Sequence, residues 1–552
     1  MKTKSTNKKI VKELILKSRK TKLPKQIDNI IIYTFLYKYC SDNIKDHLAL
    51  ELKNKEVTID EAYDNKHYQE ILSYDILKLY GFHIKNSNAF IEDVINKYYN
   101  SPKFLSVFLT IFPKNLILNS EYYNKKYIDF LFKKILLGIN IQNINEEEIE
   151  NIKEIIYLIS KLDVFELQFE FSEVFHTISS SRLMHVNSNP EFITQILSKI
   201  VLSDKYEIQN IYDPFMKNAD TLIQLNGAAE QYYGKEKNSI NYLYTIARLF
   251  INNFSLNNVF LKQEDATESI DINGAVFDVI LSRIPITIKN YHTSNINQNL
   301  EIAKRNKSSE LKNILLKELE LDNDSFTQNI ELNQALENLV EKIGFENDSA
   351  EEFNGEYEIL KDSEFLFLIN LIDSLTPDGI MAISIPENFL FKNSLETLRK
   401  YLIVEKNYID TIIRIPNEIN NIKPEVIIVF RKNKTDENIL FIDMSYDYTV
   451  QKTKSPFPFL SRKHLKLSDE TLIKMKNVFS KKLKLPKYSN LVTIDEIENN
   501  YFNLSVSRYV DTFEGDFISL DELIIEKKDI ESTIKDLDSK IDKMMDELNI
   551  KF

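Results

Sequence analysis

The spacing of hydrophobic positions divides the chain into two parts. From residue 1 to about 175, apolar residues recur at intervals of three and four, as in 30–37 and 127–132, and this spacing predicts helices. From about residue 185, short apolar runs alternate with helical patterns. The runs lie at 208–212, 259–261 and 276–281, and the helical patterns lie at 219–231 and 238–254. Such alternation predicts a doubly wound parallel sheet.

A polar, acidic and mostly helical stretch at 295–355 interrupts this pattern. The expected elements after it are a helix at 363–376, a turn at 376–379, a strand at 380–385, a helix at 393–405, and strands at 411–415 and 426–430. We therefore expect a helical N-terminal domain at 1–175 and an α/β domain at 176–450 with the insertion. A basic connector and tail at 451–518 and a C-terminal helix at 519–552 complete the expected organisation.

The last segment has hydrophobic residues at the spacing of a coiled-coil seam. These residues are Leu523, Ile530, Ile534, Leu537, Ile541, Met544 and Leu548. Polar residues fill the other faces, so the pattern favours a helix that pairs with a partner over one that packs on its own core.

Charge and composition narrow the function classes. The net charge of −13 argues against the average field of the molecule attracting nucleic acid. Two local stretches, at 8–25 and 462–487, are nevertheless basic, and each is read first as a solvated surface. No run approaches the ~18 apolar residues of a membrane helix, and the start leads into no apolar signal core. These features predict a soluble cytoplasmic protein without a membrane partner.

Cysteine and histidine usage gives little support to metal chemistry. The single cysteine, Cys40, lies on an apolar helical stretch and is interpreted as a buried thiol. The seven histidines are scattered, and no pair has the spacing of a helical metal site. We expect no metal cofactor.

Two predicted strands end in polar turns where a ligand crevice would form. The first run continues through 211–220 and the second through 277–286. The chain has only nine glycines, and none lies between Gly138 and Gly227. The first turn therefore has no residue that leaves bare backbone for a ligand to approach.

Several segments together carry a family resemblance. They are Asn189-Pro190-Glu191-Phe192-Ile193, the stretch from Thr376 to Leu390, Arg399-Lys400-Tyr401-Leu402, Phe441-Ile442-Asp443-Met444-Ser445 and the stretch from Asn503 to Val510. Their order resembles the modification (M) subunit of type I restriction-modification systems. The resemblance covers most of the chain. It implies an S-adenosylmethionine-dependent adenine-N6 DNA methyltransferase with a Rossmann-like α/β fold and a helical N-terminal domain. It also implies DNA as a ligand of the complex, with a specificity (S) subunit or similar helical partner at 519–552.

The resemblance assigns cofactor contacts to four positions. The family pattern D-P-x-C-G-S-G matches only Asp213 and Pro214, and Lys217 stands at its first glycine. Tyr233-Gly234-Lys235-Glu236 resembles the family's Y-G-x-E, so Glu236 matches the acid that binds the ribose. An ordinary acid at a helix N-terminus is an equally good interpretation of Glu236. Asp265 matches the residue near the adenine.

The catalytic turn of the family is N-P-P-F/Y. Its asparagine and a proline carbonyl accept hydrogen bonds from the amino group of a flipped adenine, and its aromatic ring stacks on the base. The aligned residues here are Arg283, Ile284, Pro285 and Ile286, and only Pro285 keeps its type. Arginine only donates hydrogen bonds. The pair Asn290-Tyr291 lacks the prolines and lies beyond the strand end, so a relocated site is disfavoured.

Three hypotheses follow from the sequence. The first is a pseudoenzyme that keeps the architecture of the family but does not transfer methyl groups, because Lys217 and Arg283 place two cations where a positively charged methyl donor would lie. The second is an active adenine-N6 methyltransferase with a divergent pocket that uses Glu236 and Asp265. The third is a protein-interaction module in phage defence or counter-defence.

Overall fold

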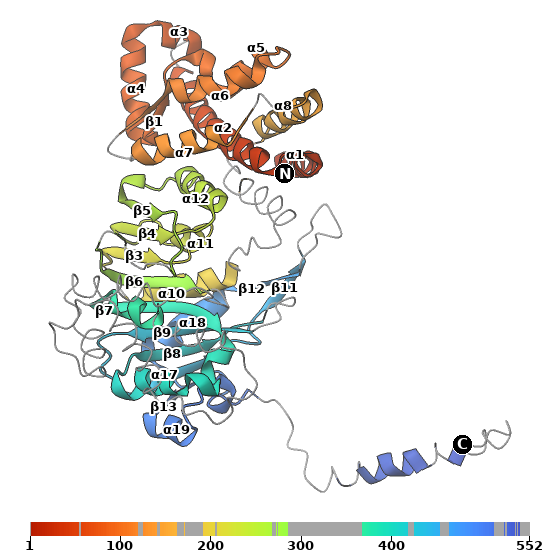
Figure 1. The fold of residues 1–552 in the computed structure, drawn as a ribbon, viewed down its shortest axis with the longest axis vertical. Helices are drawn as coiled ribbons and strands as arrows, with labels where there is room; N and C mark the ends of the chain where they lie inside the picture. Colours follow the sequence, from red (N-terminus) through yellow and green to blue (C-terminus); the bar gives the residue numbers. More distant parts are fainter. Residues whose placement is uncertain are drawn as a thin grey trace, which may run out of the picture.

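The computed structural model contains an N-terminal helical region, a large α/β sheet and a C-terminal segment (Figure 1). The residues that it describes are 2–53, 57–119, 125–140, 144–162, 171, 191–204, 207–267, 272, 274–284, 367–417, 424–452, 463–512, 524, 527–535, 537, 539 and 540. The expected insertion at 295–355 lies outside the described residues.

The N-terminal region is built around one long buried helix. Its helices are α1 (Lys2–Lys20), α2 (Pro24–Leu52), α3 (Ile59–Asp64), α4 (Lys66–Tyr80), α5 (Ile91–Tyr98), α6 (Phe104–Asn115), α7 (Lys125–Leu137) and α8 (Glu146–Ser160). A small antiparallel pair, β1 (Phe82–Ile84) and β2 (Leu116–Leu118), lies among them. Most of α2 from Ile27 to Ser41 is buried, Cys40 included, because apolar residues surround this helix on every side.

The main sheet has nine strands in the order β13-β10-β8-β9-β7-β6-β3-β4-β5. They are β3 (Asn210–Asp213), β4 (Gln231–Lys235), β5 (Val259–Lys262), β6 (Phe277–Arg283), β7 (Leu375–Pro386), β8 (Ile409–Arg414), β9 (Glu425–Arg431), β10 (Ile439–Asp443) and β13 (Ser489–Val492). All neighbours are parallel except at β9, which runs antiparallel to β7 and β8, and at β13, which runs antiparallel to β10. The α/β methyltransferase-like fold class expected from the sequence is confirmed.

Helices cover both faces of this sheet. One face packs with α10 (Glu191–Asp204), α11 (Asp220–Gln224), α12 (Ser239–Ile251) and α18 (Asp469–Lys481) into a core that is continuous with the helical region. The other face packs with residues 367–375 and with α17 (Glu396–Lys400), which the π-helical turn Tyr401–Glu405 continues. Because helices cover both faces, the central strands bury side chains on both sides, which explains their nearly continuous apolar runs.

The helical region joins the sheet through α12. The Tyr127 hydroxyl accepts a hydrogen bond from the backbone N–H of Leu261 at 2.9 Å, and the Tyr39 hydroxyl donates to the Asn253 side chain. The Phe250 ring contacts those of Tyr39 and Phe82. A core shared in this way fixes the helical region against the β4–β5 end of the sheet.

Two expectations differ from the observed elements. The turn expected at 376–379 lies inside β7. Phe277 of β6 pairs with Leu375, and Val279 pairs with Ile380, so the four residues 376–379 form a bulge in β7. The segment expected as a connector contains β11 (Thr449–Lys452), β12 (Lys463–Lys466), α18, β13 and α19 (Ile494–Asn499). Because β13 adds to the main sheet, this part of 451–518 is integral to the fold.

The described part of the C-terminal segment is helical at 527–535, as the sequence predicts, and its apolar side chains Ile530, Ile534 and Leu537 are each about half exposed. Within the described residues, no helix is long and apolar enough to cross a membrane.

Candidate functional site

The candidate site lies at the carboxyl edge of the sheet, where β3, β4 and β6 end side by side. Asp213 pairs in register with Gly234, and Arg283 pairs with Ser384 of β7. Because β9 runs antiparallel, its first residue, Glu425, reaches the same edge opposite Pro386. The order of strands therefore brings together residues that are far apart in the sequence.

The loop after β3 keeps a glycine-type backbone although it has no glycine. Lys217 and Ala219 have φ values of +48° and +57°. They occupy the two glycine positions of the D-P-x-C-G-S-G pattern. A non-glycine residue in this left-handed region costs roughly 1–2 kcal/mol. The surrounding contacts therefore have to hold the loop in this conformation.

Those contacts come mainly from α12. The Thr245 hydroxyl donates to the carbonyl of Lys217 at 2.7 Å, and the Arg248 guanidinium donates to the carbonyl of Asn218 at 2.8 Å. Arg248 also forms an ion pair with Asp220. The N–H of Met216 donates to the carbonyl of Lys235 at 3.1 Å, which fastens the loop to β4.

Met216 covers the backbone of β4. Its side chain is fully buried, and its sulfur lies only 2.5 Å from the position that a Cβ atom on Gly234 would occupy. Gly234 is therefore needed so that the loop can lie against the strand. This glycine serves packing within the chain.

Asp213 is fully buried at the end of β3. Its Oδ1 accepts hydrogen bonds from the Ser282 hydroxyl at 2.7 Å and from the N–H of Phe215 at 3.1 Å. Burial raises the pKa of the Asp213 carboxyl to about 6, although both hydrogen bonds and the nearby Lys217 lower it. Pro214, the next residue, is also buried.

Lys217 belongs to a cluster of charged side chains. Burial and the positive charge of Arg283 lower the pKa of its ammonium group to about 8, against the effect of Glu425, Asp213 and Glu236, which raise it. Among these, Glu236 has its own pKa raised to about 7 by burial. The cluster thus combines two cations with three carboxyl groups.

The acids that the resemblance assigns to a cofactor have partners within the chain. Glu236 accepts a hydrogen bond from the N–H of Asn238 at 2.6 Å, directly before α12. Asp265 forms an ion pair with Lys237 at 2.7 Å and accepts hydrogen bonds from the N–H and hydroxyl of Thr267. Glu236 lies directly after the end of β4 and also next to the N-terminus of α12.

Arg283 is bound by a buried acid. Its Nε lies 3.1 and 2.9 Å from the two carboxylate oxygens of Glu425, and its Nη2 lies 2.5 Å from Oε1. Glu425 also accepts a hydrogen bond from the Ser384 hydroxyl at 2.8 Å. Only 12% of the Arg283 side chain and 5% of the Glu425 side chain are exposed. This bidentate pair joins β6, β7 and β9.

The expected pair of cations is therefore only partly as the sequence suggests. Lys217 and Arg283 do belong to one charged cluster, but Glu425 compensates the guanidinium charge. Of the other positions in the aligned turn, Ile284 is buried and its N–H donates to the carbonyl of Ser384 at 2.9 Å. Pro285 and Ile286 lie outside the described residues.

Sequence reasoning missed Glu425, Ser282, Thr245 and Arg248. Glu425 directly precedes the strand predicted at 426–430, and an acid in front of an apolar run was the available signal. Its partner lies 142 positions earlier, so the sequence pattern gave no indication of the pairing. Among the residues that the structure describes, no group of three or more acidic, histidine or cysteine side chains could hold a metal ion.

Comparisons with known proteins agree with this fold. Residues 345–516 match the family model of the N-6 DNA methylase domain. The methyltransferase subunit of a type I restriction-modification system from Streptococcus thermophilus superimposes with a TM-score of 0.64. It has 18% identity, and the match covers 93% of this chain and all of that one. A modification subunit of a putative type I restriction enzyme from Vibrio vulnificus gives a TM-score of 0.53 at 13% identity, covering 90% of this chain and 94% of that one.

The fold of the chain is therefore that of the α/β methyltransferases. In sequence the chain is similar to methylase subunits of type I restriction enzymes, as the resemblance predicts. It is 20% identical to the MpnII methylase subunit of Mycoplasma pneumoniae over 93% of this chain and 92% of that protein. It is 30% identical to the MjaVII methylase subunit of Methanocaldococcus jannaschii over 27% of this chain and 26% of that protein.

Proposed function

We propose that the chain is a catalytically inactive relative of the type I modification subunit that serves as a structural subunit of a DNA-modification or phage-defence complex. The observation that carries this proposal is the buried bidentate pair of Arg283 and Glu425 at the catalytic turn. The asparagine of the family pattern accepts a hydrogen bond from adenine. Arg283 stands in its place, only donates hydrogen bonds and is already paired with Glu425.

The chemistry of adenine-N6 transfer explains why this replacement matters. The amino nitrogen of adenine becomes more nucleophilic when two acceptor groups accept hydrogen bonds from its N–H groups. A guanidinium has only N–H donors and cannot accept these hydrogen bonds. Arg283 is moreover fixed to Glu425 and, through it, to Ser384. Releasing it would leave a buried carboxylate without its partner, which typically costs 3–5 kcal/mol.

The residues of the loop do not fit a positively charged methyl donor. Lys217 stands at a glycine position and shares the electrostatic field of Asp213 and Glu236, the acids on which the cofactor would depend. The Lys217 ammonium already compensates part of the negative charge of these carboxyl groups. A sulfonium group brought to the same place would meet this cation in a buried environment, where repulsion is poorly screened.

Two measurements test the proposal. We expect the purified complex to incorporate no methyl label into adenine-containing duplex DNA, with an active type I methylase subunit assayed in parallel. We also expect no thermal shift with S-adenosylmethionine or with its uncharged product, S-adenosylhomocysteine. Robust label incorporation would refute the loss of catalysis. A thermal shift with S-adenosylhomocysteine but not with S-adenosylmethionine would show that the charge of the pocket excludes the sulfonium group.

An active methyltransferase with a divergent pocket is the second candidate. The observation in its favour is the loop backbone, in which Lys217 and Ala219 keep the positive φ values of the glycine pattern. If Glu236 and Asp265 bind the cofactor, a ligand at about 100 times its dissociation constant should stabilise the chain by about 2.7 kcal/mol. The same thermal-shift measurement therefore separates the two candidates.

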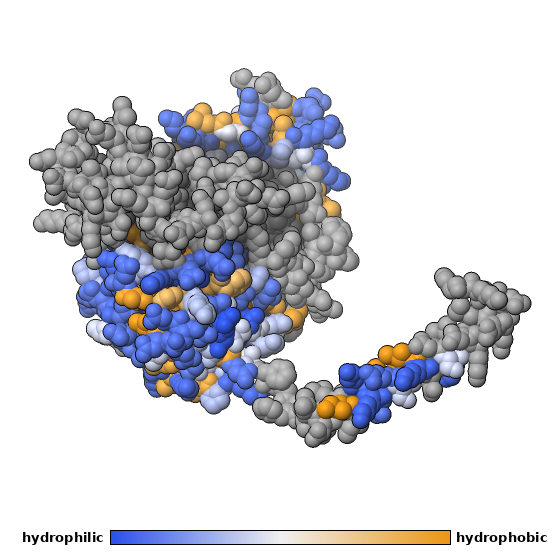
Figure 2. Space-filling model, turned by 60° about the horizontal axis from the view of Figure 1, so that its bottom comes forward, coloured by the Kyte–Doolittle hydropathy of each residue, from blue (hydrophilic) through white to orange (hydrophobic). Residues whose placement is uncertain are grey.

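The C-terminal helix is the proposed assembly element. Its described part carries exposed Ile530, Ile534 and Leu537 at helical spacing, and Figure 2 shows hydrophobic and hydrophilic residues side by side on this segment, apart from the body. A partner helix would bury this apolar row. We propose a specificity subunit or another protein with a helical spacer as the partner, in a complex that binds DNA.

A further inference from the structure

The segment from 449 to 487 has a charge opposite to that of the whole chain. It contains eleven lysine and arginine residues and only two acidic ones, Asp469 and Glu470, whereas the chain has a net charge of −13. Both acids lie in the first turn of α18, where negative charge stabilises a helix N-terminus. The remainder of the segment is left strongly basic.

The fold turns this segment into a projecting ribbon and a surface helix. The strands β11 and β12 form an antiparallel pair that extends from the side of the main sheet (Figure 1). They follow β10, which runs parallel to β3 and β6 through its neighbours, so the ribbon begins near the carboxyl edge that holds the candidate site. The helix α18 comes next and packs on α10 through Leu472, Met475 and Phe479.

The lysines of this segment whose side chains the structure describes divide into two groups. Lys482 binds Asp410, and Lys474 lies 3.8 Å from Asp447 and over the Tyr488 ring, so both serve contacts within the chain. Five others are exposed and form no ion pair with any described residue. These five, which we call the basic surface, are Lys466, Lys476, Lys481, Lys484 and Lys487.

Exposed aromatic residues lie next to the basic surface. Tyr446 is 77% exposed and Tyr448 is 39% exposed in the loop that leads into β11. The ion pair between Asp447 of this loop and Lys474 of α18 holds the loop beside the helix. The loop is therefore held against α18, and the ribbon directly follows the loop in the chain.

We propose that the basic surface binds the sugar-phosphate backbone of duplex DNA. Lysines free of acidic partners can replace the counterions that a DNA duplex carries, and this release provides most of the affinity of sequence-independent binding. A two-stranded ribbon also has the dimensions that the major groove admits. The proposal rests on the role in a DNA complex proposed above, but it does not depend on whether methyl transfer is lost.

Binding of the full-length chain to a fluorescent duplex oligonucleotide at several salt concentrations tests the proposal. The test variant replaces Lys476, Lys481 and Lys484 by glutamine, and a second variant replaces Lys466 alone to report on the ribbon. The control variant replaces Lys66, Lys78 and Lys85, three exposed lysines of the helical region that form no ion pair with a described residue. Test and control triples change the net charge equally.

We expect the test triple to bind the duplex more weakly, with the slope of log affinity against log salt shallower by about one for each lysine that contacts a phosphate. The control should keep the affinity and slope of the wild type. Equal losses in both triples would mean that only the average charge matters and would overturn the proposal. So would an unchanged test triple, or a loss confined to single-stranded DNA or RNA. A methylation assay on the same variants is independent of this result.

Discussion

Glu236 shows how a single buried acid makes stability depend on pH. Burial raises the pKa of its carboxyl from 4.5 to about 7. The folded state therefore binds the proton more tightly than the unfolded chain, so stability from this group is present below pH 4.5 and is lost as the pH rises through 7.

We expect the Glu236→Gln variant to lack this dependence, because glutamine is neutral throughout the range. Between pH 4.5 and 7, the free energy of unfolding of the wild type should fall relative to the variant by on the order of 2 kcal/mol. Urea denaturation at a series of pH values measures the difference. Asp213, whose pKa burial raises to about 6, is present in both proteins and cancels to first order. Parallel pH profiles would show that Glu236 is not desolvated.

The pair of Arg283 and Glu425 makes a second prediction at the scale of residues. Glu425→Gln removes the charge that compensates a guanidinium with only 12% of its side chain exposed, so we expect a loss of roughly 3–5 kcal/mol. The double variant Arg283→Met, Glu425→Gln removes both charges of the pair and should recover much of this loss. Chemical denaturation of the two single variants and the double variant gives the coupling energy. A single variant within 0.5 kcal/mol of the wild type, in the manner of ordinary surface changes, would contradict a buried structural pair.

The sequence predicted the position of this site better than its contacts. Apolar runs located β3 and β6, and their alternation with helices predicted a doubly wound parallel sheet, in which β9 and β13 nevertheless run antiparallel to their neighbours. The left-handed backbone of Lys217 and Ala219 was not predictable from residue type, because neither lysine nor alanine favours positive φ and tertiary contacts such as those of Thr245 and Arg248 hold the loop there. Arg283 was recognised as a misplaced cation, but its acid partner comes from a strand 142 residues later.

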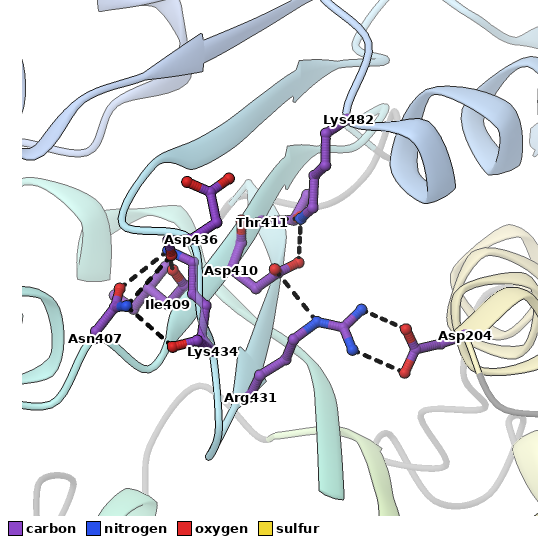
Figure 3. A network of polar contacts seen from close by, with 9 residues as sticks. All are labelled: Asp204, Asn407, Ile409, Asp410, Thr411, Arg431, Lys434, Asp436 and Lys482. Atoms are coloured by element: carbon purple, nitrogen blue, oxygen red, sulfur yellow. Dashed lines mark hydrogen bonds and ion pairs between the residues drawn. The ribbon is translucent and has the colours of Figure 1, made fainter. Parts of the chain in front are cut away.

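At the scale of elements, one ionic network fixes two helices to the sheet (Figure 3). Asp410 of β8 lies between Lys482, at the C-terminal end of α18, and Arg431 of β9, with N–O distances of 2.5 and 3.3 Å. Arg431 also forms a two-bonded pair with Asp204 at the end of α10. The network lies at the edge of the sheet opposite the candidate site, because Asp410 is near the start of β8 and Arg431 is at the end of the antiparallel β9.

We expect Asp410→Asn to destabilise the fold by roughly 3–5 kcal/mol, because two cations lose the charge that they share. Asp204→Asn should cost less, since Arg431 would keep Asp410. Asp75→Asn is the matched control: this exposed residue of α4 lies outside the network, and its change should stay within about 0.5 kcal/mol. Thermal or urea unfolding of the three variants gives the order. A loss in Asp75→Asn as large as that in Asp410→Asn would disprove the role assigned to the network.

The same network explains why the segment 451–518 was difficult to interpret from the sequence. Its lysines and prolines are typical of an exposed connector, yet α18 buries Leu472, Met475 and Phe479, and Lys482 closes the helix with a left-handed residue that binds Asp410. Four apolar positions among many lysines are a weak periodic signal. The acid that orders Lys482 comes from a strand 72 residues earlier, which local pattern does not reveal.

At the scale of the whole molecule, the C-terminal helix is separable from the body. Its described side chains are exposed, and the Lys527–Glu531 pair at 3.8 Å is internal to the helix. We therefore expect the stability of the sheet and of the helical region not to depend on its described part, whereas the proposed assembly would. Folding and partner binding should respond differently when this segment is removed.

Deletion of 519–552 should therefore leave the melting temperature of the body unchanged, because none of the described side chains of this segment packs in either core. The deleted chain should lose co-purification with a specificity subunit or other helical partner. A finer variant, Ile530→Asp with Ile534→Asp, should have the same effect, since it places charges in the apolar row while the helix keeps its length. As a control, Lys528→Gln with Lys535→Gln changes two exposed residues on the opposite face of the same helix, lowers the net charge equally and should retain the partner. If the deletion lowered the melting temperature while the Ile530 and Ile534 variant still bound its partner, the segment would be part of the core and assembly would depend on another surface.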